Sequence, residues 1–122
     1  MTVEKQAQTT AKLTWSAIQN NDKIALRLAG ELSRNTLLPL WNEWKRQQRF
    51  AVLSTSQMAA HVIEWDLSSL TRMDSAGFAL FSELLHDIQK MAVSQKIINV
   101  PDELMTLAEL FDLDNWLKTF ID

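Results

Sequence analysis

The sequence predicts one α/β domain, a mixed four-stranded sheet with helices packed against it, in the element order ββαβαβαα. The first two patterned segments alternate apolar and polar residues, which indicates a β-hairpin. After them, strand-like apolar runs alternate with helical patterns, which requires crossover connections and therefore parallel strand pairs. The chain has 122 residues, of which 47% are hydrophobic, and this is enough apolar material for a single core.

The hairpin is expected to join residues 13–19 to residues 23–32 through the turn sequence Asn-Asn-Asp. A first helix is expected within residues 34–49, because apolar residues recur there every three or four positions. Asn35 is its expected N-cap. Residues 50–60 have no clear period, so helix continuation and loop are both open interpretations.

The second half of the chain supplies the remaining strands and helices. Residues 61–68 read as a buried strand, and residues 75–92 have the clearest helical period in the chain. A short strand over residues 95–100 is stopped by a proline, and helices follow over residues 102–113 and 114–121. Strand-to-helix turns of such sheets gather helix N-termini along one edge, where ligands and partners commonly bind.

The charge pattern argues against nucleic acid as a partner. The net charge is -3, from 12 basic and 15 acidic residues, so the chain has no overall attraction to a polyanion or an anionic membrane. Trp41 and Trp44 lie close in sequence to Lys45, Arg46 and Arg49. We interpret this group as core tryptophans with solvated charges, because the helix needs its tryptophans for packing.

Other features bear on compartment and domain limits. There are no cysteines, which excludes disulfides and thiolate metal sites and is compatible with the cytoplasm. Residues 1–12 are polar, lack the apolar segment of a secretory signal and are expected to form a flexible tail before a domain over residues 13–122. No apolar run approaches the roughly 20 residues that span a bilayer, so direct membrane insertion is not expected.

The sequence offers no catalytic, cofactor or metal site. Ser75 and His86 are separated by eleven helical steps, a rise of about 16 Å, which is too far for a nucleophile and its base. His61 lies at the start of the strand whose opposite end leads to Ser75. Two glycines cannot build a phosphate-binding loop, and the carboxylates are scattered.

The helix over residues 75–92 carries the candidate docking surface. At 100° per residue, Ser75, Ala79 and Ser82 fall on the outward face, with Phe78 at its border. Gly77 falls on the apolar stripe instead. Glycine costs about 1 kcal/mol relative to alanine inside a helix, so a structural role is expected for Gly77, namely close approach of the helix to the sheet.

The residues Asp74 and Ser75 at the start of this helix have two interpretations. Both residue types are favoured N-caps, because their oxygens accept hydrogen bonds from free backbone N–H groups. However, Ser75 faces outward at the positive end of the helix, bordered by an aromatic and small side chains. A phosphate or an acidic partner group would be stabilised there, which indicates a docking or switching point.

The stretch "DLSSLTRMDSAGFALF" resembles the STAS family, in which a strand, a polar turn and the pattern Asp-Ser/Thr-small-Gly open the central helix. Together with "GELSRNTLLPLW" and "LMTLAELFDL", it is similar to the STAS-domain subunits of Mla-type phospholipid ABC transporters of Gram-negative bacteria. The resemblance covers about residues 13–120 and implies the STAS fold.

The resemblance also implies a function. It implies a non-enzymatic cytoplasmic subunit, held at the inner membrane by its partner, that binds and supports the ATPase of a transporter maintaining outer-membrane lipid asymmetry. The residues expected to contact that ATPase are Asp74, Ser75, Phe78, Ala79 and Ser82. Ser75 stands where these subunits usually have threonine, and serine is also what phosphorylated anti-sigma-factor antagonists carry. The alternative is therefore a regulator switched by phosphorylation of Ser75.

Overall fold

The computed structural model describes residues 12–47, 62–91 and 93–121. The expected tail, apart from Lys12, and the segment 50–60 lie outside the described residues, as does His61.

The sheet has four strands in the order β1-β2-β3-β4, which confirms the expected mixed sheet. Its strands are β1 (Leu13–Asn20), β2 (Lys23–Leu32), β3 (Val62–Met73) and β4 (Gln95–Ile98). The first pair is antiparallel and forms the expected hairpin, in which Asn21 has a positive φ of 59°. The pairs β2–β3 and β3–β4 are parallel.

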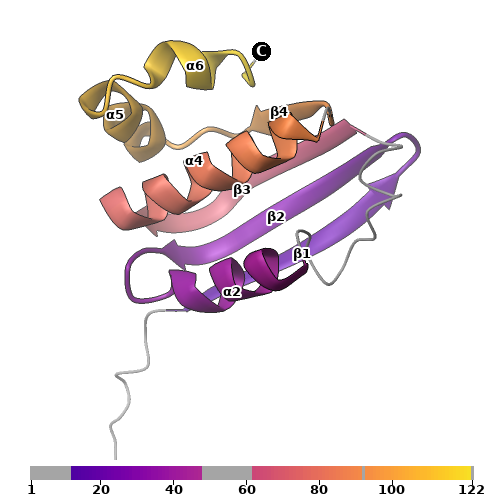
Figure 1. Ribbon diagram of the computed structural model, residues 1–122, viewed down its shortest axis with the longest axis horizontal. Coiled ribbons are helices and arrows are strands. Elements are labelled where there is room, and N and C mark those ends of the chain that lie inside the picture. Colours follow the sequence, from indigo (N-terminus) through magenta and orange to yellow (C-terminus); the bar gives the residue numbers. More distant parts are fainter. Residues whose placement is uncertain (1–11, 48–61, 92, 122) are drawn as a thin grey trace, which may run out of the picture.

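Four helices complete the order ββαβαβαα. They are α2 (Leu37–Gln47), α4 (Ser75–Lys90), α5 (Asp102–Leu110) and α6 (Asp114–Lys118). In Figure 1, α4 runs between α2 on one side and the α5–α6 pair on the other. This arrangement leaves the outer side of α4 flanked by helices from both halves of the chain.

The strand β3 is longer than the sequence indicated, because it continues through Met73 instead of ending near residue 68. Its polar second half stays paired with β2 up to the partners Leu32 and Met73, with irregular register around Gly30. Gly30 has φ of 96°, and an added Cβ would press on the backbone of Lys12. Residues that read as a polar turn are therefore held in the sheet, which brings the end of β3 next to the end of β2.

The helix α2 begins at Leu37, so the expectation of Asn35 as its N-cap was wrong. The backbone N–H of Asn35 instead donates to Ser33 Oγ at 3.2 Å. Thr36 Oγ1 accepts from the backbone N–H of Ser33 at 3.0 Å and donates to the carbonyl of Glu31 at 2.8 Å. A side-chain-bonded turn thus separates the end of β2 from the helix.

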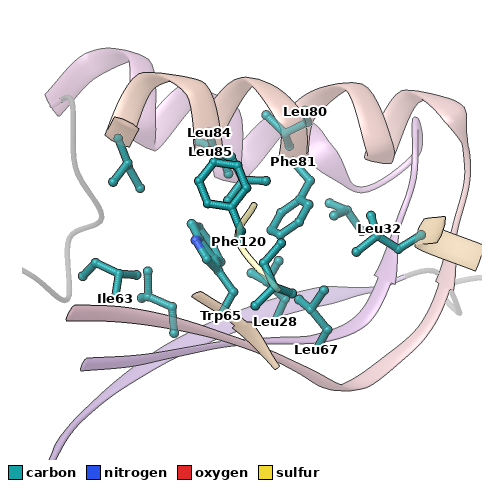
Figure 2. Packing of buried hydrophobic residues seen from close by; sticks show 14 of the residues in the cluster. Leu28, Leu32, Ile63, Trp65, Leu67, Leu80, Phe81, Leu84, Leu85 and Phe120 are labelled. Carbon is teal, nitrogen blue, oxygen red and sulfur yellow. The ribbon is translucent and has the colours of Figure 1, made fainter. Parts of the chain in front are cut away.

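The core lies between the sheet and the helices (Figure 2). Alternate residues of β2 and β3 are buried there, and Trp65 meets Phe81 of α4 edge to face with ring centroids 5.2 Å apart. Trp44 is fully buried, and its Nε1 donates to Asp87 Oδ2 at 2.9 Å, which ties α2 to α4. Trp41 is partly buried, and Lys45 Nζ lies 5.9 Å from its ring centroid.

The C-terminal segment completes the core next to β4. Leu117 and Phe120 are buried, and Phe120 lies among the core side chains in Figure 2. The backbone N–H of Ile97 in β4 donates to the carbonyl of Phe120 at 2.7 Å. The last described turn therefore adds both apolar side chains and a backbone hydrogen bond to the sheet edge.

Candidate protein-docking site

Asp74 fixes the start of α4 through both of its carboxylate oxygens. Its Oδ1 accepts from the backbone N–H of Gly77 at 2.8 Å, which makes it the N-cap of the helix. Its Oδ2 accepts from the backbone N–H of Arg34 at 3.2 Å, in the turn that leads into α2. One carboxylate therefore holds the N-terminus of α4 and the α2 turn in a fixed relation.

Gly77 lies where the first turn of α4 meets the end of β2. A Cβ built on Gly77 would overlap the carbonyl oxygen of Leu32 and lie 2.6 Å from its carbonyl carbon. Because no side chain fits in that space, only glycine lets the first turn of α4 rest on the end of β2.

The outward face of α4 carries small side chains, as expected. Ser75 and Ala79 are exposed and Ser82 is half-buried. The Oγ atom of Ser82 is itself buried and has no hydrogen-bond partner among the described residues. His86 lies further along the same face and is exposed.

Phe78 was expected at the border of the outward face, but its side chain is buried. Phe78 is only 2% exposed, and its ring stacks on Phe111 with centroids 5.7 Å apart and an angle of 11° between planes. Phe111 follows α5 and packs over Phe78 from outside. Phe78 therefore supports the face from below, whereas Phe111, which is 48% exposed, presents the aromatic surface.

A shallow apolar groove runs along α4, made of three hollows that share lining residues. Its floor is the row of small side chains on α4, one wall comes from α2, and the other comes from the α5–α6 segment. We call it the α4 groove, and it is lined by Leu37, Trp41, Ser75, Ala76, Phe78, Ala79, Leu80, Ser82, Glu83, His86, Phe111, Leu113 and Trp116.

Four of the five expected contact residues line this groove, namely Ser75, Phe78, Ala79 and Ser82. Asp74 does not line it and acts at the helix start instead. Sequence reasoning missed both walls, because their apolar residues have the helical spacing of ordinary core positions. Only the three-dimensional arrangement shows that they flank the outer side of α4.

Among the described residues, the pKa of Asp66 is clearly shifted, and Asp66 belongs to the sheet and not to the groove. Burial raises the pKa of Asp66, but hydrogen bonds from Asn99, Ser68 and Arg27 outweigh it and hold that pKa well below its ordinary value. Asp66 Oδ1 accepts from Asn99 Nδ2 and the Ser68 backbone, each at 3.0 Å, and Oδ2 accepts from Arg27 Nη2 at 3.1 Å. With both oxygens engaged, this carboxylate links β2, β3 and the end of β4.

Within residues 12–47, 62–91 and 93–121, no three His, Asp or Glu side chains are grouped so that they could hold a metal ion. In the same part of the chain, no helix has the length and apolar character to cross a membrane. The α4 groove is lined mostly by apolar and small side chains, with Glu83 and His86 among its lining residues.

Comparison with known proteins adds a family and several relatives. The STAS domain family model matches residues 14–122. The intermembrane phospholipid transport system binding protein MlaB of Haemophilus influenzae is 46% identical over 109 residues, covering 89% of this chain and 99% of that protein. The protein of the same description from Escherichia coli is 33% identical over 101 residues, covering 83% of this chain and 89% of that protein.

Solved structures show the same fold at low sequence identity. The anti-sigma factor antagonist SpoIIAA in its unphosphorylated form matches with a TM-score of 0.56 and 16% identity, covering 89% of this chain and 86% of that one. The phosphorylated form of SpoIIAA from Bacillus matches with a TM-score of 0.60 and 16% identity, covering 89% of each chain.

Proposed function

The chain belongs to the STAS domain family, and from this premise we propose that it is a non-enzymatic subunit that docks on the ATPase of an ABC-type phospholipid transporter. The observation that carries the proposal is the 46% identity to a binding protein of an intermembrane phospholipid transport system, across 99% of that relative. The subunit would work at the cytoplasmic side of the inner membrane, in a system that maintains outer-membrane lipid asymmetry.

The α4 groove is the proposed docking site. Its apolar lining residues suit burial against another protein, and exposed apolar patches of this kind mark interaction surfaces. The floor carries no long charged side chain between Ser75 and Ser82, so a partner can approach the backbone of α4 closely. Binding there would hold the ATPase in an arrangement competent for transport.

Co-purification tests this function. The tagged chain is expressed in its own cells, membranes are solubilised in detergent, and the proteins that it retains are identified by mass spectrometry. The expected result is an ABC ATPase together with an integral membrane subunit. The purified chain alone should not hydrolyse ATP, and retention of no ATPase would overturn the proposal.

Variants at Ser75 locate the docking site. Ser75→Arg places a long charged side chain beside the groove and should abolish retention of the ATPase, because an unpaired charge would be buried at the interface. Ser75→Thr keeps the hydroxyl and should retain the ATPase. Ser94→Arg is the matched control, because Ser94 is exposed beyond the opposite end of α4. Equal retention by all three would place the docking site elsewhere.

The co-purification experiment also distinguishes the transporter subunit from the alternative, a regulator switched by phosphorylation of Ser75. Ser75 is exposed in the first turn of α4, so a kinase could reach its hydroxyl. Retention of a kinase-like partner, together with phosphate on Ser75 in the purified chain, would favour the regulator over the transporter subunit.

A further inference from the structure

The shape of the α4 groove matches a helix better than an extended peptide. Its floor is a row of small residues along α4, and apolar walls rise on both sides from α2 and from α5–α6. From Ser75 to His86 the floor extends for about 16 Å, roughly three helical turns. It offers no open strand edge, so a partner in the groove would pack by side chains, as a helix in a groove does.

Large apolar side chains are exposed beside the walls. Among the described residues, four large hydrophobic side chains are prominently exposed, and three of them lie on or next to a wall. Phe111 is 48% exposed and lines the groove, Leu110 beside it is 72% exposed, and Leu38, next to the wall residue Leu37, is 59% exposed. The fourth, Ile18, is in β1.

The two margins of the groove differ in charge. On the α5–α6 side, Glu109 and Asp112 flank Leu110 and the groove residue Phe111 in sequence. Both are exposed, and neither forms an ion pair within the part of the chain that the structure describes. Glu83 lies on the floor, where it lines the hollow next to α2 and the hollow next to α6, and it is also exposed and without an ion pair among the described residues. The α2 side carries Lys45 over Trp41 instead.

The exposed carboxylates beside the groove favour a partner that carries positive charge. Unpaired carboxylates beside an apolar groove attract cations and repel the phosphates of lipid headgroups and nucleic acids. We infer that the α4 groove receives an amphipathic helix of the ATPase subunit, with its apolar side on the small-residue floor and basic residues along the edge facing α5–α6. This inference rests on the proposed function and specifies which part of the partner would bind.

The first test reverses the acidic charges. Binding of the purified ATPase subunit is measured for the full chain and for Glu83→Lys, Glu109→Lys and the double variant, with Asp22→Lys in the β1–β2 turn as the control. Each single reversal should weaken binding severalfold and the double reversal about tenfold or more, because rim charges contribute modestly and in the same direction. Asp22→Lys changes the net charge equally and should leave affinity unchanged.

Raising the salt concentration from about 0.05 to 0.5 M should weaken binding of the parent and flatten the differences between these variants. A second, uncharged pair of variants tests the apolar wall. Leu110→Ser should weaken binding at least about tenfold, whereas Ile18→Ser, which changes an exposed apolar residue of β1, should not. Both positions are more than half exposed, so the variants should fold, which a thermal melt verifies.

Hydrogen exchange on the ATPase subunit identifies its bound segment. A protected helix with lysine or arginine on one edge is expected, and changing those residues to glutamate should restore binding to the double variant. If the double variant binds the ATPase subunit with parental affinity, the helix inference is wrong but the docking function stands. The same holds if a strand or a loop of the ATPase subunit is protected from exchange instead of a helix. Absence of ATPase binding by the parent chain overturns both.

Discussion

Gly77 in the first turn of α4 lies directly against the carbonyl group of Leu32, the last residue of β2. Because the backbone of the helix touches the backbone of the strand there, the position of α4 above the sheet is set at its N-terminal end. The outer side of the same turn forms part of the α4 groove, so this backbone contact also fixes the position of the groove floor relative to the sheet.

Gly77→Ala tests that contact. Alanine should stabilise an ordinary helix position by about 1 kcal/mol, but here its Cβ overlaps the Leu32 carbonyl, so we expect a net loss of about 1 to 3 kcal/mol in the free energy of unfolding. Gly77→Leu should lose more. Denaturant titration measures both, and an unchanged midpoint for Gly77→Ala would contradict the close approach.

Asp74→Ala should also destabilise the protein, by about 1 to 2 kcal/mol, because it removes an N-cap. The N–H of Gly77 would lose its acceptor, and the link to Arg34 would be lost with it. Asp74→Asn keeps one oxygen for Gly77 and should lose less, whereas Ser75→Ala should have little effect. Comparable losses for Asp74→Ala and Ser75→Ala in chemical denaturation would argue against Asp74 as the cap.

Ionisation of Asp66 should contribute to the pH dependence of the free energy of unfolding. Its pKa is lowered in the folded protein relative to the ordinary value of 3.8. The folded state therefore favours the ionised form, so this contribution is present above about pH 5 and is lost progressively as the pH falls through about 4 and below. Asp66→Asn should reduce stability at pH 7 and make the acid side of the profile less steep.

The exposed Asp22 provides the control for this comparison. Asp22→Asn removes the same charge from an exposed turn position and therefore measures the effect of net charge alone. If Asp66→Asn and the parent lose stability in parallel between about pH 5 and pH 3, the hydrogen bonds to Asp66 do not act as the structure indicates.

Phe78→Ala should destabilise the fold severely, by about 3 to 5 kcal/mol, because a buried aromatic side chain is deleted. Phe78 is 2% exposed, so the loss would come from the core and from its stacking on Phe111. This variant is consequently unsuitable for mapping a partner. Thermal melting of Phe78→Ala beside Phe78→Leu measures the effect, and near-parental melting of the alanine variant would refute the buried position.

Ser82→Ala should leave stability unchanged or raise it by up to about 1 kcal/mol. The Oγ atom of Ser82 is buried without a hydrogen-bond partner among the described residues, and an unsatisfied buried hydroxyl costs free energy. Differential scanning calorimetry of the variant and the parent measures this change. A clear loss of stability would mean that the hydroxyl has a partner in solution.

Most of the fold could be predicted from periodicity, because the β2 pattern and the α4 stripe depend on local alternation of apolar and polar residues. The long second half of β3 could not. Its residues from Ser68 to Arg72 are mostly polar, and they stay in the sheet because they pair with the end of β2, a contact distant in sequence. The start of α2 was misplaced for a similar reason, since Ser33 and Thr36 form a turn of their own.

The docking surface could be predicted only in part. Ser75, Ala79 and Ser82 follow from the helical geometry of α4 alone. The position of Phe78 depends on Phe111, which arrives from a different element and covers it, and nothing in the pattern of residues 75–92 identifies that neighbour. The walls of the groove likewise depend on which helices flank α4.

The hydrogen bond from Ile97 to the carbonyl of Phe120 has a consequence for biosynthesis. The sheet pairs strands in order, but the core beside β4 stays open until Leu117 and Phe120 are in place. A nascent chain still lacking them would expose apolar surface of α4 to solvent. Native closure of this part of the core therefore requires synthesis of the chain through Phe120.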